Sequence, residues 1–250
     1  MVDNPCRFRP RMSTSRPGVI ELSLGGRGPK KAFVFDPHRL ALPCWAEAGG
    51  PSMLITFDRH FDTVPPRART PRGLSNDELD RHAREQLDAR NFDHIPAAMQ
   101  AGVITDALII ARARPPGALT ADFEDHALIT ASTLDVVTAE WGTDHASPEG
   151  KRVAAALARA ERVVLDFDLD CFTTPSDADP TTVVPWTLEL IRDFVQPRGS
   201  APFWDAVLAR CVLMTFAREP GHCGGLVASG RLFEAAAQAI FVELLRGDLP

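Results

Sequence analysis

The chain has 250 residues, of which 45% are hydrophobic, and it carries a formal net charge of −6. This length and apolar content suit a single large α/β domain, which we expect over residues 19–250. The acidic balance argues against nucleic acid as a partner, and no apolar run approaches the roughly 18 to 20 residues of a membrane-spanning helix.

The amino-terminal half predicts three strands separated by irregular or helical segments. Residues 1–18, rich in Pro, Arg and Ser, predict a poorly ordered lead-in without the apolar core of a secretory signal, so we expect a cytoplasmic protein. The polar stretch 63–91 predicts a loop followed by an exposed helix, and loops of this kind often shape substrate pockets. The predicted strands are VIELSL (19–24), KAFVFD (31–36) and SMLITF (52–57), with a helical segment, HRLALPCWAEAG (38–49), after the second.

The carboxyl-terminal half alternates apolar strands with amphipathic helices. Such an alternation is typical of a parallel sheet covered on both faces, so we expect a three-layer α/β/α fold with a mainly parallel sheet. Ligands of such sheets bind outside the carboxyl ends of the strands. Strands are predicted at 106–112, 126–132, 162–167 and 210–216, and helices at 95–102, 151–160, 186–195, 203–210 and 231–247.

Acidic side chains occupy alternate positions where two of the predicted strands end. Alternate residues of an extended backbone face the same way, so each group can converge on one point. Like carboxylates in a poorly hydrated crevice repel and raise one another's pKa unless cations neutralise them. The two groups are Asp58, His60 and Asp62 in LITFDRHFDT, and Asp166, Asp168 and Asp170 in VVLDFDLDC.

The joint pattern predicts one shared site for a divalent metal. Taken singly, each group is also compatible with an acidic strand end that faces solvent, or with helix caps and turns. Two such groups, both after buried strands and one containing a histidine, favour metal binding. Oxygen ligands with one or two imidazoles suit Mn²⁺ better than structural zinc. The five cysteines include no C-x-x-C pair, so they predict neither a zinc knuckle nor a disulfide framework.

Both acidic motifs resemble those of the arginase/ureohydrolase superfamily. DRHFD (58–62) resembles the D-x-H-x-D motif of that family, and DFDLD (166–170) is similar to its S-x-D-x-D motif, with Asp166 in place of the serine. The resemblance spans the chain from about Lys31 onward and implies an arginase/deacetylase-like α/β/α fold. FDPHRLALPCW (35–45) also resembles the opening of the atypical arginase-like family that includes peptide arginases of ribosomal-peptide pathways.

The resemblance implies a pair of Mn²⁺ ions that share a hydroxide. Asp58 and Asp168 are the ligands implied to bridge the two ions. The resemblance also implies that this hydroxide would attack an electrophilic carbon and that Asp62 would pass the proton to the leaving amine. The other implied ligands are His38 and Asp62 on one ion, and His60 and Asp170 on the second.

The first histidine ligand is the point at which the chain departs from the family. Ordinary ureohydrolases carry a G-G-D-H motif ahead of D-x-H-x-D, and none precedes Asp58 here. GTDH (142–145) resembles it but comes too late in the chain. We therefore expect His38, just past a predicted strand, to be the ligand; a helix-capping or packed histidine is the alternative.

Glu219, in TFAREPGH after the last predicted strand, has the chain position of the glutamate that binds guanidinium in ureohydrolases. The alternative is an ordinary loop acid beside Arg218. His94 and His222 are each a candidate for a proton shuttle or a pocket wall, and Asp166 is a candidate for orienting the metal ligands through hydrogen bonds. Structural or exposed positions are expected for His82, His126 and His145.

The expected activity is that of a binuclear manganese hydrolase that cleaves a guanidinium C–N bond and releases urea. The resemblance favours arginine within a peptide, converted to ornithine as a post-translational modification in ribosomal peptide biosynthesis. Free arginine, agmatine and other guanidino or amidino compounds are alternative substrates. A homo-oligomer is compatible with the sequence, which does not specify the oligomeric state.

Three other functions compete with this one. VVLDFDLDCFT also resembles the nucleophile motif of haloacid-dehalogenase-like phosphatases, but those enzymes use a later basic residue, usually lysine, and no lysine follows Lys151. Metal-dependent deacetylases commonly use a tyrosine hydroxyl, and the chain has no tyrosine. An inactive metal-binding scaffold is the third alternative.

Overall fold

The structure, a computed structural model, describes residues 10–11, 16–112, 120–123, 126–131, 137, 141, 143–144, 146–179 and 181–245. The strands of its main sheet are β1 (Pro10–Arg11), β2 (Val19–Ser23), β3 (Lys31–Phe35), β4 (Ser52–Asp58), β5 (Ile104–Ala111), β6 (Thr120–Phe123), β7 (His126–Ala131), β8 (Val163–Asp168) and β11 (Cys211–Ala217).

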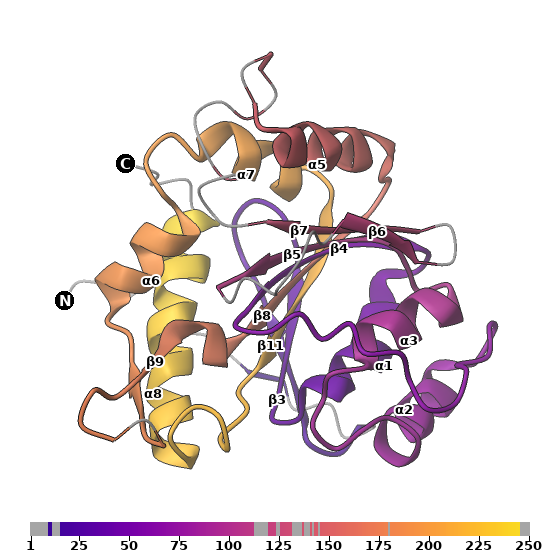
Figure 1. The fold of residues 1–250 in the computed structure, drawn as a ribbon, viewed down its shortest axis with the longest axis horizontal. Coiled ribbons are helices and arrows are strands. Elements are labelled where there is room, and N and C mark those ends of the chain that lie inside the picture. The colour runs from indigo at the N-terminus through magenta and orange to yellow at the C-terminus, as the bar shows by residue number, and fades with distance from the viewer. Residues whose placement is uncertain are drawn as a thin grey trace.

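This nine-stranded sheet forms the middle layer of the molecule, in the order β1-β2-β3-β11-β8-β4-β5-β7-β6 (Figure 1). All neighbours from β3 to β7 in that order pair in parallel. At one edge β2 pairs antiparallel with β3, and β1 pairs antiparallel with β2. At the other edge β6 pairs antiparallel with β7. A small separate sheet pairs β9 (Thr173–Pro175) with β10 (Val183–Pro185).

Helices cover both faces of the main sheet (Figure 1), which confirms the predicted three-layer α/β/α fold with a mainly parallel sheet. None of the helices in the described part of the chain combines the length and the hydropathy that a bilayer-spanning helix requires. One face carries α1 (Ala41–Trp45), α2 (Asn76–Glu85) and α3 (His94–Ala101); the other carries α5 (Pro148–Arg159), α6 (Leu188–Val195), α7 (Ala201–Leu208) and α8 (Leu226–Ala237).

The helical segments differ from their predicted bounds in ways that have local causes. Pro43 is tolerated because it lies in the first turn of α1, where a missing N–H removes no bond within the helix. A capping box between Ser75 and Glu78 starts α2. The closing helix begins at Leu226 rather than at residue 231, and it continues beyond α8 as a π-helical segment, Gln238–Leu244.

The amino-terminal lead-in is described only in part. Pro10–Arg11, inside the predicted lead-in, pairs with β2, whereas residues 1–9 and 12–15 lie outside the described part. Cys6 belongs to that outside part, and the other four cysteines are buried and free: Cys44, Cys171, Cys211 and Cys223.

A row of phenylalanines fixes the register of the three central strands. Phe57, Phe167 and Phe216 lie at paired positions on β4, β8 and β11. The rings of Phe57 and Phe167 stack with their centroids 5.1 Å apart, and so do those of Phe167 and Phe216. A slip of one residue would send these rings to the other face, so the packing holds the residues that follow each strand in fixed relative positions.

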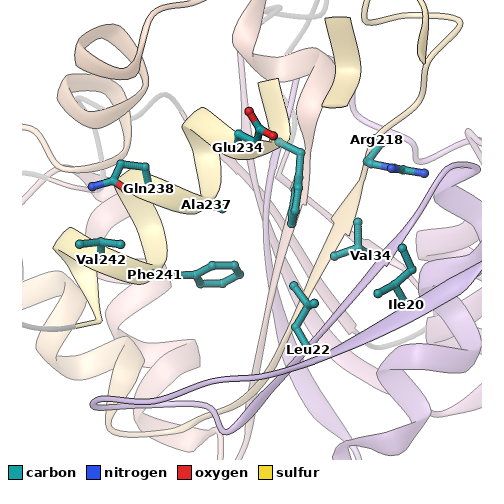
Figure 2. A pocket seen from close by; sticks show the side chains of 10 residues that line it. Ile20, Leu22, Val34, Arg218, Glu234, Ala237, Gln238, Phe241 and Val242 are labelled. Atoms are coloured by element: carbon teal, nitrogen blue, oxygen red, sulfur yellow. The ribbon is translucent and has the colours of Figure 1, made fainter. Parts of the chain in front are cut away.

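An apolar cavity of about 450 Å³ lies on the same face of the sheet as α8 (Figure 2). Its walls come from β2 and β3 on one side and from α8 and the π-helical segment on the other; they include Ile20, Leu22, Val34, Phe233 and Phe241. None of the predicted site residues lines this cavity.

Candidate metal centre

The two acidic motifs meet at the carboxyl edge of the sheet. β4 ends at Asp58 and β8 ends at Asp168, and these strands are direct parallel neighbours. Both side chains are buried, with exposed fractions of 0% and 2%. The structure therefore brings these two predicted ligands together at the carboxyl edge of the sheet, where ligands of parallel sheets bind.

The same local turn follows each strand. One carboxylate oxygen of Asp58 accepts the backbone N–H of His60 at 2.7 Å, and one oxygen of Asp168 accepts the backbone N–H of Asp170 at 3.1 Å. Each turn leaves the second oxygen of its first aspartate free to point elsewhere. The two turns also bring Nδ1 of His60 to within 3.1 Å of Oδ2 of Asp170.

His38 joins the acids from the segment after β3. Its Nδ1 lies 3.0 Å from Oδ2 of Asp168, 3.5 Å from Oδ2 of Asp62 and 3.7 Å from Oδ2 of Asp58. These four side chains can each offer one ligand atom within 4.8 Å of the others. Neither Nδ1 of His38 nor Oδ2 of Asp58 has a partner of hydrogen-bond geometry, although both are buried.

A second group of ligand atoms adjoins the first. Asp58, His60 and Asp170 can also bring ligand atoms within 4.8 Å of one another. Both carboxylate oxygens of Asp170 are buried without a hydrogen bond. Asp58 belongs to both groups, whereas Asp168 belongs to the first only.

Asp166 holds His38 in place through a buried network. Its Oδ2 lies 2.8 Å from Nε2 of His38 and accepts the hydroxyl of Thr56 at 2.7 Å. Its Oδ1 accepts the hydroxyl of Thr215, which in turn accepts the indole N–H of Trp45 at 3.0 Å. With Nε2 of His38 donating to Asp166, Nδ1 faces the acid cluster, and in the neutral ring it would carry the lone pair of a carboxylate-oriented metal ligand.

Burial and repulsion penalise the ionised cluster. Burial raises the pKa of Asp58 well above its usual value, and the carboxylates of Asp62, Asp168 and Asp170 raise it further. Burial likewise raises the pKa of Asp168, with the negative charges of Asp170 and Glu219 adding to the effect. In the absence of cations these carboxyl groups therefore resist ionisation.

The protonation of His38 is tied to its acidic neighbours. Burial alone lowers its pKa, but the charges of Asp166 and Asp168 overcome this effect and raise the pKa well above the usual value. Burial raises the pKa of Asp166, and the charge of His38 together with the threonine hydroxyls lowers it below the usual value. A proton on His38 thus offsets part of the negative charge of the neighbouring carboxylates. A bound metal ion could offset that charge in its place.

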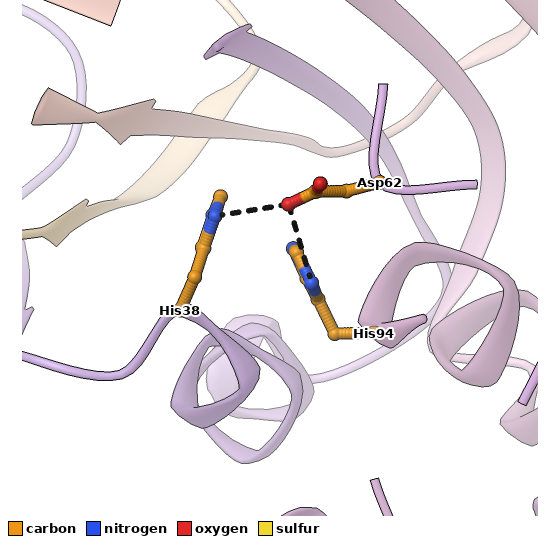
Figure 3. A group of neighbouring side chains, drawn as sticks. All are labelled: His38, Asp62 and His94. Carbon is orange, nitrogen blue, oxygen red and sulfur yellow. Dashed lines mark ion pairs between the residues drawn. The ribbon is translucent and has the colours of Figure 1, made fainter. Parts of the chain in front are cut away.

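His94 lies against His38, with ring centroids 4.1 Å apart (Figure 3). Nδ1 of His94 is 2.7 Å from the backbone carbonyl of Asn91 and 3.8 Å from Oδ2 of Asp62. Burial lowers the pKa of His94 to about 4, and the charge of His38 contributes. The ring is therefore neutral, and its buried Nε2, which has no hydrogen-bond partner, carries a free lone pair.

Glu219 lies beside the cluster and is held by one of its two oxygens. Oε1 accepts the backbone N–H of His38 at 3.2 Å and the side-chain amide of Asn91. Oε2 lies 3.9 Å from Nε2 of His222, and ligand atoms of Asp170, Glu219 and His222 come within 4.8 Å of one another. Burial raises the pKa of Glu219. Its second oxygen is the one left for a bound cation.

Backbone strain gathers at this site. Among the described residues, the non-glycine positions with positive φ are Asp62 at 47°, Asn91 at 63° and Glu219 at 35°. Each of the three contacts another residue of the site. Such conformations are costly for L-residues and commonly mark sites that hold side chains in required positions.

Several of the other histidines are placed elsewhere or are not described. Nε2 of His82 lies 3.0 Å from the hydroxyl of Thr70, away from the acids. The side chain of His126 and all of His145 lie outside the described residues, as does Gly142 of the GTDH motif.

Four residues of the site were missed by the sequence reasoning: Asn91, Thr56, Thr215 and Trp45. The two threonines had a usable signal, since each interrupts an apolar strand just before a phenylalanine, in LITF and in LMTF. The aspartate of VVLDF has the same position. Asn91 had no comparable signal, because its role depends on a left-handed backbone and on partners far away in sequence.

The donor set fits a divalent metal. Within the described part of the chain, His38, Asp58 and Asp170 have unpartnered buried ligand atoms and belong to two groups that share Asp58. Carboxylate oxygens with imidazole nitrogens are ligands suited to Mn²⁺ and related ions, and no described cysteine belongs to the groups. In comparisons with known proteins, no family model matches this chain and no curated protein matches its sequence.

Replacing Asp58 by Asn should raise the free energy of unfolding of the metal-free protein by about 1–2 kcal/mol, because it removes one buried acid while keeping an oxygen for the His60 N–H. Chemical denaturation at pH 8 in EDTA measures this. Asp177→Asn, at an exposed aspartate, is the control and should change stability by less than about 0.5 kcal/mol. If the Asp58→Asn protein is less stable in EDTA, repulsion among the buried carboxylates does not lower the stability of the metal-free protein.

Mn²⁺ should raise the melting temperature by roughly 5–10 °C at pH 8 and by less at pH 5.5. The raised pKa values of Asp58 and Asp168 make the metal-free protein lose stability as pH rises above the usual carboxyl range, and the contribution of protonated His38 is lost in the same direction. Because these pKa values are raised, protons on the three groups compete with the metal more strongly at pH 5.5 than at pH 8. Thermal scans with Mn²⁺ or EDTA at both pH values test this, and an equal or larger shift at pH 5.5 contradicts it.

Proposed function

We propose that this chain is a manganese-dependent ureohydrolase that hydrolyses the guanidinium group of arginine, preferably within a peptide, to ornithine and urea. The observation that carries the proposal is the meeting of two acidic motifs at neighbouring strand ends, where Asp58, Asp168 and Asp170 face one buried region with His38 and His60. The order and spacing of these motifs also resemble those of ureohydrolases.

His38, Asp58, Asp62 and Asp168 form the set that would hold one Mn²⁺ ion, and Asp58, His60 and Asp170 the set for a second. Such a pair, when bound, acidifies a water molecule and orients it for attack on an electrophilic carbon. The network around Asp166 keeps the His38 ring in one orientation, which preserves the position of its ligand nitrogen.

Glu219 is the residue that would bind the guanidinium. Its Oε1 is fixed by His38 and Asn91, so its Oε2 can accept N–H groups of a planar cation without rearrangement. The backbone strain at Glu219 and Asn91 supports a positioned rather than a mobile carboxylate.

Asp62 and His94, which lie in or beside the cluster, can take part in the proton transfer. Asp62 lies within 3.5 Å of the ligand nitrogen of His38, so it can take a proton near the attacking water and give it to the leaving amine. His94, neutral and beside Asp62, can accept a hydrogen bond through its free Nε2 and so orient water or substrate.

The competing phosphatase reading gains no support from the arrangement of Asp166. As the first aspartate of its motif, Asp166 would be expected to attack phosphate, but it is fully buried and both of its oxygens accept hydrogen bonds from threonines. A phosphate group has no open path to a carboxylate in that position.

Loaded with Mn²⁺, the protein should release urea from an arginine-containing peptide faster than from free arginine or agmatine. Asp168→Ala should lower kcat/KM by at least about 10³-fold, because it removes a ligand of the first ion. Asp177→Asn should retain full activity. Urea release and metal content, measured on the same samples, test both statements.

The outcomes separate the parts of the proposal. Urea from none of the three substrates, with metal bound, would leave a metal-binding scaffold in place of a ureohydrolase. Urea from free arginine alone removes the peptide preference. Undiminished activity of Asp168→Ala removes the binuclear mechanism.

A further inference from the structure

A groove of about 490 Å³ lies between β10 and the first turns of α8. Its walls are largely apolar, and the volume exceeds that of one large aliphatic side chain. The residues that line it are Pro185, Trp186, Gly224, Val227, Ala228, Arg231 and Leu232.

One wall of the groove belongs to the loop that carries Glu219 and His222. Gly224 follows His222 closely in this loop and lines the groove. A Cβ at Gly224 would lie 3.4 Å from Cβ of Ala228 and 3.5 Å from Cγ2 of Val183, so the loop packs against both α8 and β10. The groove therefore adjoins the segment that we assign to guanidinium binding.

The opposite wall is tied to the segment that carries Asp170. The backbone N–H of Trp186 donates to the carbonyl of Phe172 at 2.9 Å, and its indole N–H donates to the hydroxyl of Thr174 at 2.7 Å. Arg112 lies over the Trp186 ring at 4.3 Å and donates to the carbonyl of Cys171 at 2.7 Å. The Trp186 wall is thus fixed to the loop just after a predicted metal ligand.

The segments that carry the groove and the site expose several side chains, some of them apolar. The side chains of His60 and His222 are 52% and 56% exposed, and their ring centroids are 6.4 Å apart. Leu226 and Val227, at the start of α8, are 70% and 71% exposed. Val184, next to Pro185, is 53% exposed. Large apolar side chains exposed beside an open polar site are typical of a surface that a ligand covers.

We propose that this groove binds an apolar side chain of the residue next to the target arginine in a peptide substrate. The inference rests on the proposed function, since it takes the arginine to lie at Glu219. The groove is attached to both loops that hold the site, so a chain whose guanidinium enters the acid cluster can place its neighbouring side chain against Trp186 and Val227. Free arginine has no such side chain and gains nothing from the groove.

The test compares three capped peptides, Leu-Arg-Gly, Gly-Arg-Leu and Gly-Arg-Gly, on the Mn²⁺-loaded protein. At least one of the leucine peptides should exceed Gly-Arg-Gly by about tenfold in kcat/KM, as expected for partial burial of one leucine side chain. Val227→Asp should abolish this preference. Leu190→Asp is the matched control, because Leu190 is 52% exposed but does not line the groove, and it should keep the preference.

Calorimetric titration of the same peptides supplies a readout that does not require turnover. A tenfold tighter Kd for a leucine peptide that is lost in Val227→Asp and kept in Leu190→Asp supports the groove. Urea release at equal kcat/KM from all three peptides, or a preference that survives Val227→Asp, overturns the groove and leaves the ureohydrolase standing. Preferential, Val227-dependent binding without urea from any peptide supports the groove as a peptide site and overturns the ureohydrolase.

Discussion

Carboxylates from two neighbouring strands cannot share a buried space in ionised form unless positive charge offsets their repulsion. The structure places the carboxylates of Asp58, Asp168 and Asp170 in such a buried space. The raised pKa values of Asp58 and Asp168 reflect the energetic cost of ionising them there. A protonated His38 supplies part of the positive charge. The buried oxygens of Asp58 and Asp170 that lack hydrogen-bond partners are ones that a cation could bind, and the proposed chemistry requires that cations occupy the cluster.

The central strands supply the rigidity that such a cluster needs. Thr56, Asp166 and Thr215 lie at paired positions on β4, β8 and β11, and they face α1 while the stacked phenylalanines face the other helical layer. One register therefore serves both faces of the sheet. A slip between strands would disrupt the aromatic stacking and break the hydrogen bonds of Asp166 together, so that the stability of the core and the orientation of His38 are linked.

Local sequence patterns predicted the layers, the parallel sheet and the convergence of Asp58 with Asp168, because strand periodicity and strand direction determine those features. The prediction of His38 as a ligand also required its position in the chain order and the family resemblance. The role of Asn91 and the groove beside Trp186 were not predictable in the same way. They depend on left-handed backbone and on contacts between distant segments, which are 128 residues apart for Asn91 and Glu219 and 59 apart for Arg112 and Cys171. The β9 and β10 pairing was missed because each strand has only 3 residues and ends at a proline.

Anomalous diffraction at the manganese edge, from crystals grown with Mn²⁺, would show whether cations occupy the acid cluster. We expect two peaks, one among His38, Asp58, Asp62 and Asp168 and one among Asp58, His60 and Asp170. Crystals with no peak at these carboxylates, or with Asp58 and Asp168 turned apart into solvent, would contradict it.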